Sequence, residues 1–113
     1  MKKPKYIIVG NQFRMGWVEL HWELAAQEKK SIKGGGYWCF LDEEKTELLL
    51  YGFSFDFGHV TKDQLTEVFT NGLLPPRLAR RVVKVYHSNG IKQDQAKEDK
   101  DLLLEREVDV INN

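Results

Sequence analysis

His21 is the residue of this chain best suited to carry out chemistry. It follows Trp17-Val18-Glu19-Leu20 and precedes a stretch of good helix formers from Trp22 to Glu28. A histidine at a helix N-terminus faces the positive end of the helix dipole, which disfavours the imidazolium form. The ring is then neutral near pH 7 and can act as a base or a nucleophile. The alternative is that His21 only caps the helix or is satisfied within the core.

Two glycine-containing segments could bring an anion to this histidine. The triple glycine at 34–36 lacks the lysine and hydroxyl residue of a nucleotide P-loop, and we expect a flexible turn there. In the segment 51–58, alternation places three phenylalanines on one side of a strand, with Ser54 and Asp56 on the other. The plainer interpretation is a strand that ends in a turn. The functional interpretation is a cluster of backbone N–H groups that suits a phosphate.

Composition excludes several other classes of protein. Lys+Arg and Asp+Glu both number 17, so the formal net charge is zero, which argues against nucleic-acid binding. The sequence contains no CxxC, HExxH or D-x-D-x-D-G pattern, and we expect no metal and no cofactor. The single cysteine, Cys39, indicates a reducing compartment and fits a small buried side chain. No signal peptide or membrane-spanning run is visible, so we expect a cytoplasmic protein without membrane contact.

The elements that must position these residues follow from hydrophobic periodicity. A length of 113 residues fits one domain. Thr61 is the expected N-cap of a helix, with Gln64 completing a capping box and Asn71-Gly72 ending it. The expected strands cover 5–9, 13–19, 37–41, 46–53 and 82–86, and the expected helices cover 21–30 and 61–69, with a helical turn at 77–81. This pattern predicts an α+β fold, a single compact domain with a mainly antiparallel mixed sheet flanked by two helices.

The composition changes near the C-terminus. We divide the chain into a domain over 1–91 and a charged C-terminal extension over 92–113. The first part of the extension, to Asp101, is polar and predicts a solvated linker or an exposed helix. The apolar residues from Leu102 to Ile111 then predict a short element that either folds back on the domain or meets a partner, including a second copy of the chain.

Several motifs together resemble the small phosphohistidine phosphatases that include the Janus and Ocnus proteins. The resemblance covers roughly residues 5 to 90. The motifs that carry it are Lys5-Tyr6, Trp17-x-Glu19-x-His21, Gly34-Gly35-Gly36, Tyr51-Gly52-Phe53-Ser54, Phe57-Gly58 and Asn89-Gly90. Each motif is weak alone, and their order and spacing are moderately specific.

The resemblance implies removal of phosphate from phosphohistidine without a metal. The family's catalytic histidine falls on His21, its substrate-side lysine on Lys5 and its phosphate-loop serine on Ser54. Backbone amides near His21 and from Ser54 through Phe55 to Asp56 would then hold the phosphate oxygens. The implied substrate is a phosphorylated protein or a small phosphoramidate.

Two departures from the family pattern support an alternative function. Tyr37 follows the triple glycine where the animal phosphatase has arginine, and Asp56 lies two places after Ser54 where that protein has alanine. A carboxylate roughly 5 Å from a phosphate would cost about 3 kcal/mol at an effective dielectric near 20, unless Asp56 turns away or pairs with a cation such as Lys5. The alternative is a catalytically impaired homologue that binds an anion or serves as a protein-interaction module. A small structural protein without any site is a third hypothesis.

Overall fold

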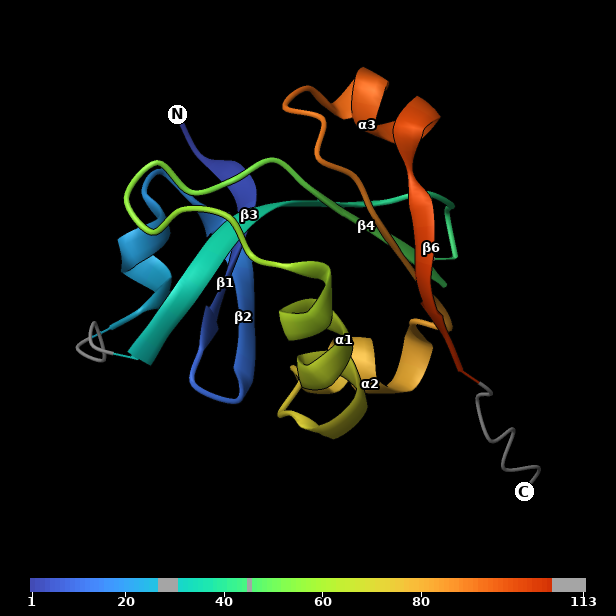
Figure 1. Cartoon of the computed structure of the whole chain (residues 1–113), viewed down its shortest axis with the longest axis horizontal. Helices are drawn as coiled ribbons and strands as arrows, with labels where there is room; N and C mark the ends of the chain where they lie inside the picture. The colour runs from blue at the N-terminus through green and yellow to red at the C-terminus, as the bar shows by residue number, and fades with distance from the viewer. Residues whose placement is uncertain (27–30, 45, 107–113) are drawn as a thin grey trace.

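Six strands form one mixed sheet in the computed structural model, which describes residues 1–26, 31–44 and 46–106. Their order across the sheet is β2 (Gln12–Val18), β1 (Lys3–Val9), β3 (Ile32–Phe40), β4 (Glu47–Tyr51), β5 (Lys84–His87) and β6 (Asp101–Glu105) (Figure 1). The pairing of β4 with β5 is parallel, and the other four strand pairings are antiparallel. The predicted fold class, α+β with a mainly antiparallel sheet in a single domain, is confirmed.

The helices cover both faces of this sheet. α1 (Lys62–Asn71) and α2 (Pro76–Arg81) connect β4 to β5, whereas α3 (Gln93–Asp99) connects β5 to β6 and lies apart from them in Figure 1. Successive side chains of β4 point to opposite faces of the sheet, so this strand contributes to the packing on both faces. Leu48 and Leu50 pack with α1 and α2, while Leu49 packs with Ala96 of α3. None of the described helices is both long enough and apolar enough to span a membrane.

The start and end of α1 confirm the predicted capping pattern. The Thr61 hydroxyl accepts a hydrogen bond from the Gln64 amide at 3.1 Å, and the Gln64 side chain accepts one from the Thr61 amide at 3.0 Å. At the other end, the Gly72 amide donates to the carbonyl of Val68. These contacts depend on residues close in sequence, which is why the pattern alone predicts them.

The predicted helix over 21–30 is wrong in its described part. A 3₁₀ helix, η1, covers only His21–Leu24, and Ala26 adopts a left-handed φ of 53° that ends it; residues 27–30 lie outside the described residues. The Arg14 guanidinium donates to the carbonyls of Leu24 and Ala25 at 3.1 and 3.0 Å. Those carbonyls would otherwise accept the hydrogen bonds of a continuing helix, so the side chain of Arg14 takes the place of the next turn.

The predicted break at the triple glycine is also wrong. Residues 34–36 lie within β3, which runs on to Phe40. A Cβ at Gly35 would lie 2.5 Å from the Tyr6 carbonyl oxygen, and a Cβ at Gly36 would lie 2.6 Å from that of Tyr51. The glycines therefore permit close approach within a sheet, a role that local sequence does not distinguish from a turn.

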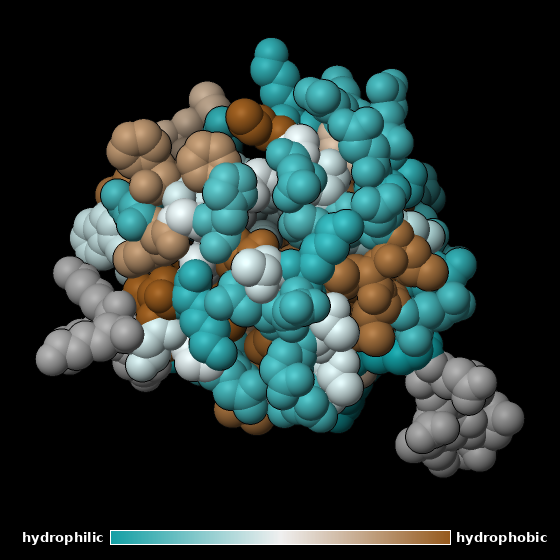
Figure 2. All heavy atoms as spheres, in the orientation of Figure 1, coloured by the Kyte–Doolittle hydropathy of each residue, from teal (hydrophilic) through white to brown (hydrophobic). Residues whose placement is uncertain are grey.

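The C-terminal segment folds back on the domain as far as the structure describes it. β6 pairs antiparallel with β5, and Leu103 and Leu104 pack against the main core. Arg106 extends this attachment, because its guanidinium donates to the carbonyls of Val82 and Leu78 at 2.7 and 2.8 Å. Figure 2 shows an apolar patch over β6, where Leu102 is 51% exposed. The part of the predicted element from 107 to Ile111 lies outside the described residues.

Candidate functional site

His21 lies on the sheet face that also carries α3. η1 follows β2 and lays the imidazole over Gly35 of β3, and the residue is only 4% exposed. Lys5 of β1 and Tyr37 of β3 are directly paired in the sheet, and the rings of Tyr37 and His21 meet edge to face with centroids 5.5 Å apart. Two strands and one short helix thus bring these side chains together.

One hydrogen bond determines which nitrogen of His21 is left for chemistry. Nε2 lies 2.8 Å from the carbonyl oxygen of Gly36. A carbonyl can only accept, so Nε2 carries the proton in the neutral ring and Nδ1 presents its lone pair. Among the described residues, Nδ1 has no hydrogen-bond partner. It also does not belong to the fully buried side-chain atoms without a partner, a class that contains Nδ1 of His87. Nδ1 is therefore the atom available as a base or nucleophile.

The surroundings of His21 favour its neutral form. Burial lowers the pKa of His21 below its usual value; the hydrogen bond to Gly36 opposes this shift, the charge of Lys5 adds to it, and the charge of Asp56 opposes it. From the sequence, the neutral form was expected to result from the positive end of a helix dipole. With only four residues in η1, burial is the larger cause of the lowered pKa.

Gly35 is a component of this site that sequence reasoning missed. A Cβ there would lie 3.1 Å from Cδ2 of His21 as well as against the backbone of Tyr6. The absence of a side chain leaves the space that the imidazole occupies. Sequence offered one signal, a triple glycine fifteen residues after the histidine, but nothing in it specified that the two would meet.

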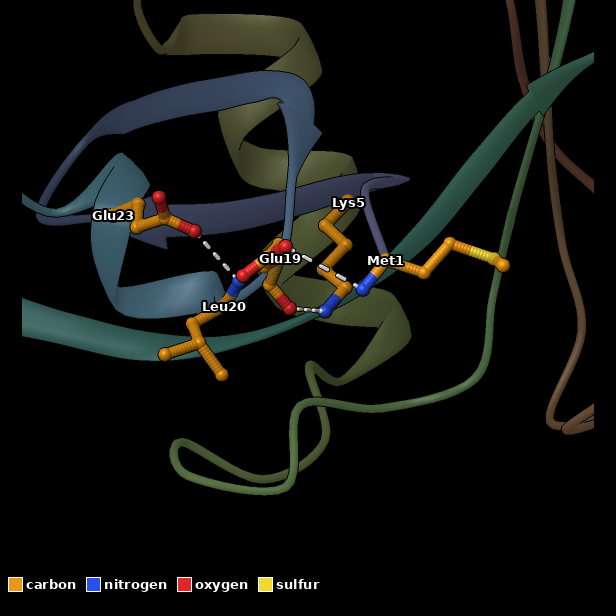
Figure 3. Close-up of polar contacts among 5 residues, drawn as sticks. All are labelled: Met1, Lys5, Glu19, Leu20 and Glu23. Carbon is orange, nitrogen blue, oxygen red and sulfur yellow. Dashed lines mark hydrogen bonds and ion pairs between the residues drawn. The ribbon is translucent and has the colours of Figure 1, made fainter.

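Lys5 is largely buried, and its side chain reaches the turn that precedes η1. Its ammonium donates to the backbone carbonyl of Glu19 (Figure 3), and it lies 5.9 Å from the centroid of the Tyr37 ring. The same turn is held by Glu23, whose carboxylate accepts from the Leu20 amide at 2.7 Å. The carbonyl that accepts from Lys5 is neutral and does not cancel the charge of the ammonium. The positive charge of Lys5 therefore still helps to lower the pKa of His21.

Ser54 begins a tight turn that is attached to Gly35. The Ser54 amide donates to the Gly35 carbonyl at 3.0 Å, and the Gly35 amide donates to the Gly58 carbonyl at 3.1 Å. The Ser54 hydroxyl accepts from the Phe57 amide at 3.1 Å, and the residue is only 1% exposed. Ser54 therefore holds the turn in shape beside His21, and its buried hydroxyl faces the loop rather than open solvent.

The tip of this turn consists of Phe55 and Asp56, which are both exposed. No hydrogen bond from either amide is recorded among the described residues, whereas the amides of Ser54, Phe57 and Gly58 all donate within the turn or to β3. The Asp56 carboxylate is close enough to raise the pKa of His21. Neither described ion pair joins Asp56 to Lys5. The structure thus places Lys5 and His21 around Tyr37, brings Asp56 within electrostatic reach of His21, and leaves two amides at the tip as open donors.

The described residues contain no group of three His, Cys, Asp or Glu side chains that could hold a metal ion. Comparison of the chain with protein-family models, with curated proteins and with solved structures gives no match.

Proposed function

We propose that this chain is a metal-independent phosphatase that acts on protein phosphohistidine or a related phosphoramidate. The observation that carries the proposal is the fixed tautomer of His21, with Nδ1 unprotonated beside a buried lysine. A neutral histidine near a cation suits hydrolysis of an anionic substrate, because the base is ready and the phosphate charge is offset. The order of motifs shared with the small phosphohistidine phosphatases supports the same reaction.

Each residue of the site has a role in this proposal. Nδ1 of His21 removes a proton from the attacking water, or attacks the phosphorus itself. In the first case the P–N bond breaks as water bonds to phosphorus, and the substrate nitrogen leaves with the proton that His21 took from the water. In the second case His21 keeps the phosphoryl group, the substrate nitrogen takes a proton from water, and a further water hydrolyses phosphorylated His21 to release phosphate. Lys5 offsets the phosphate charge, Ser54 holds the turn, and the amides of Phe55 and Asp56 donate to phosphate oxygens. The Phe55 side chain is 93% exposed at this point, which favours a protein-sized substrate over a small ion.

Turnover of a phosphohistidine peptide tests the proposal. We expect His21→Ala to lower kcat by at least a hundredfold, the usual contribution of a positioned general base. His59→Ala is the matched control, because His59 is an exposed histidine whose ring packs against Phe53 rather than against the Lys5–Tyr37 pair. Equal activity of wild type and His21→Ala would reject the assignment. Rapid quenching with labelled substrate separates the two roles of His21, because only a nucleophile leaves labelled phosphate on the protein.

A second function, an anion-binding or protein-interaction module without catalysis, is favoured by Asp56. Its exposed carboxylate lies at the tip that would meet the phosphate and has no ion pair with Lys5. Repulsion between the carboxylate and a phosphate would weaken substrate binding.

The Asp56→Ala variant distinguishes the two functions. If Asp56→Ala gains phosphatase activity that the parent lacks, the second function is supported, whereas robust turnover by the parent excludes it. A phosphate titration followed by NMR at the amides of His21 and residues 54–56 tests whether an anion site is present. Without shifts there, the phosphatase and the anion-binding module are both rejected, and only the protein-interaction module is left.

We further propose that the protein works in the cytoplasm. Its single cysteine is free and buried in the structure, an arrangement that fits a reducing compartment.

A further inference from the structure

A cavity of about 500 Å³ lies beside His21 on the same face of the sheet. Lys5, Tyr37 and Tyr51 are consecutive partners across β1, β3 and β4, so their side chains form a row on that face. The cavity begins where this row passes Tyr37, and Tyr51 continues its floor. Its far wall is the segment that leads into α3, which the Gly52 amide ties down by donating to the Gly90 carbonyl at 3.0 Å.

The lining of the cavity combines an apolar floor with two positive charges. The stacked rings of Tyr37 and Tyr51, with centroids 5.7 Å apart, line the cavity together with Pro4 and the exposed side chain of Ile91. Lys3 from β1 and Lys92 from the start of α3 both line the cavity, and both are exposed. The described lining contains no carboxylate that would neutralise them. A volume of this size with an apolar base and few polar groups is typical of a ligand site.

The cavity is within reach of a chain that is bound at His21. Tyr37 contacts the imidazole on one side and stacks on Tyr51 on the other, so two ring contacts, of 5.5 and 5.7 Å, connect His21 with the cavity floor. An extended peptide rises about 3.3 Å per residue and would cover that span in about three residues. Neighbours of a phosphorylated residue can therefore lie in the cavity.

We propose that this cavity binds an acidic side chain of the substrate protein, about three residues from the phosphorylated one, with its carboxylate between Lys3 and Lys92. The inference rests on the proposed function for the position of the phosphorylated residue. The aromatic floor takes the aliphatic part of the side chain or its backbone, and the two ammonium groups take the charge. Substrate choice would thus depend on residues outside the catalytic centre.

Two phosphohistidine peptides test the proposal. One carries glutamate three residues before and three residues after the phosphohistidine, and the other carries lysine at the same two positions. We expect wild type to favour the glutamate peptide about fivefold in kcat/KM, with the difference in KM, because two exposed ion pairs supply an effect of about that size. Lys3→Glu/Lys92→Glu should reverse the preference. Lys33→Ala/Arg80→Ala is the control: it removes two exposed charges that do not line the cavity and should keep the preference.

Binding of the unphosphorylated peptides makes the result independent of catalysis. The glutamate peptide should shift the ring signals of Tyr37 and Tyr51 in wild type and not in Lys3→Glu/Lys92→Glu. If these shifts occur without any turnover, the cavity is assigned correctly and the phosphatase function is wrong. If both peptides turn over equally and neither shifts the rings, the phosphatase function stands and the cavity proposal is overturned. A reversal of preference that also appears in the control would overturn it as well.

Discussion

The imidazole of His21 occupies a space that only a glycine at position 35 of β3 leaves open. Gly35 lies under Cδ2 of the ring, and the carbonyl of Gly36 receives the proton of Nε2. Both contacts come from β3, so the strand supplies the room for the ring and also its tautomer. The strand therefore fixes the position and the tautomer of His21 together.

Gly35→Ala tests this dependence at the scale of one methyl group. The new Cβ would meet the Tyr6 backbone and the His21 ring, and the backbone cannot give way. We expect a loss of about 3 kcal/mol in the free energy of unfolding, measured by urea denaturation. Gly16→Ala is the control, because a Cβ there meets mainly the flexible end of Leu24 at 3.2 Å. Similar losses in both variants would contradict the role of Gly35.

The two buried histidines predict a stability that depends on pH. Burial is the main cause of the lowered pKa of His21 and of His87, whose Nδ1 is enclosed without a hydrogen-bond partner. The unfolded chain then binds more protons than the folded one as the pH falls below about 6.5, the ordinary histidine value. We expect full stability above that pH and a loss on acidification of at most about 1.4 kcal/mol per pH unit for each histidine. Urea denaturation between pH 7.5 and pH 5 measures this slope, and His87→Gln should reduce it; an unchanged slope would count against His87.

At the scale of elements, α1 depends on its N-cap. Thr61→Ala removes the hydroxyl that accepts the Gln64 amide, and we expect it to lower the free energy of unfolding by about 1 kcal/mol. Thr66→Ala is the control, since Thr66 lies within the helix, where alanine is the better helix former. Thermal unfolding of both variants checks the prediction, and an equal change in the two would contradict it.

The elements differ in how far their sequence determines them. The capping box of Thr61 and Gln64 was predicted because both partners lie in one turn of helix. The end of η1 was not, because it depends on the guanidinium of Arg14 from a neighbouring strand. The placement of Gly35 under His21 depends on pairing between segments far apart in sequence. For the site, sequence motifs indicated His21, Lys5 and the turn after Ser54, whereas the burial of Ser54 and the contacts of Tyr37 required the fold.

At the scale of the whole molecule, the last described elements complete the core. α3 and β6 cover the small cluster of Cys39, Leu49 and Tyr51 and the outer side of β5. We expect a chain that ends at Gly90 to unfold at a lower temperature and to aggregate. A chain that ends at Arg106 keeps every described contact and should unfold with the full-length protein. Calorimetry compares the three, and a stable chain ending at Gly90 would show that α3 and β6 are dispensable.

Self-association through the C-terminal tail is a separate proposal. Size-exclusion chromatography of the full-length chain and its variants tests it. Leu103 and Leu104 pack against the core. Among the described residues of the tail, Leu102 on the edge strand is therefore the exposed large apolar side chain that a partner would contact. We expect Leu102→Lys to abolish any concentration-dependent increase in size of the full chain. An increase that persists in this variant would place the contact elsewhere.

The order of strands across the sheet has a consequence for how the protein is made. Apart from the exchange of β1 and β2, the spatial order follows the order along the chain. During translation, each new strand therefore leaves the ribosome when the edge that it must join is already present. Strands β3 to β6 can add one after another without opening earlier pairs, and each addition covers the edge that could otherwise capture a neighbouring nascent chain.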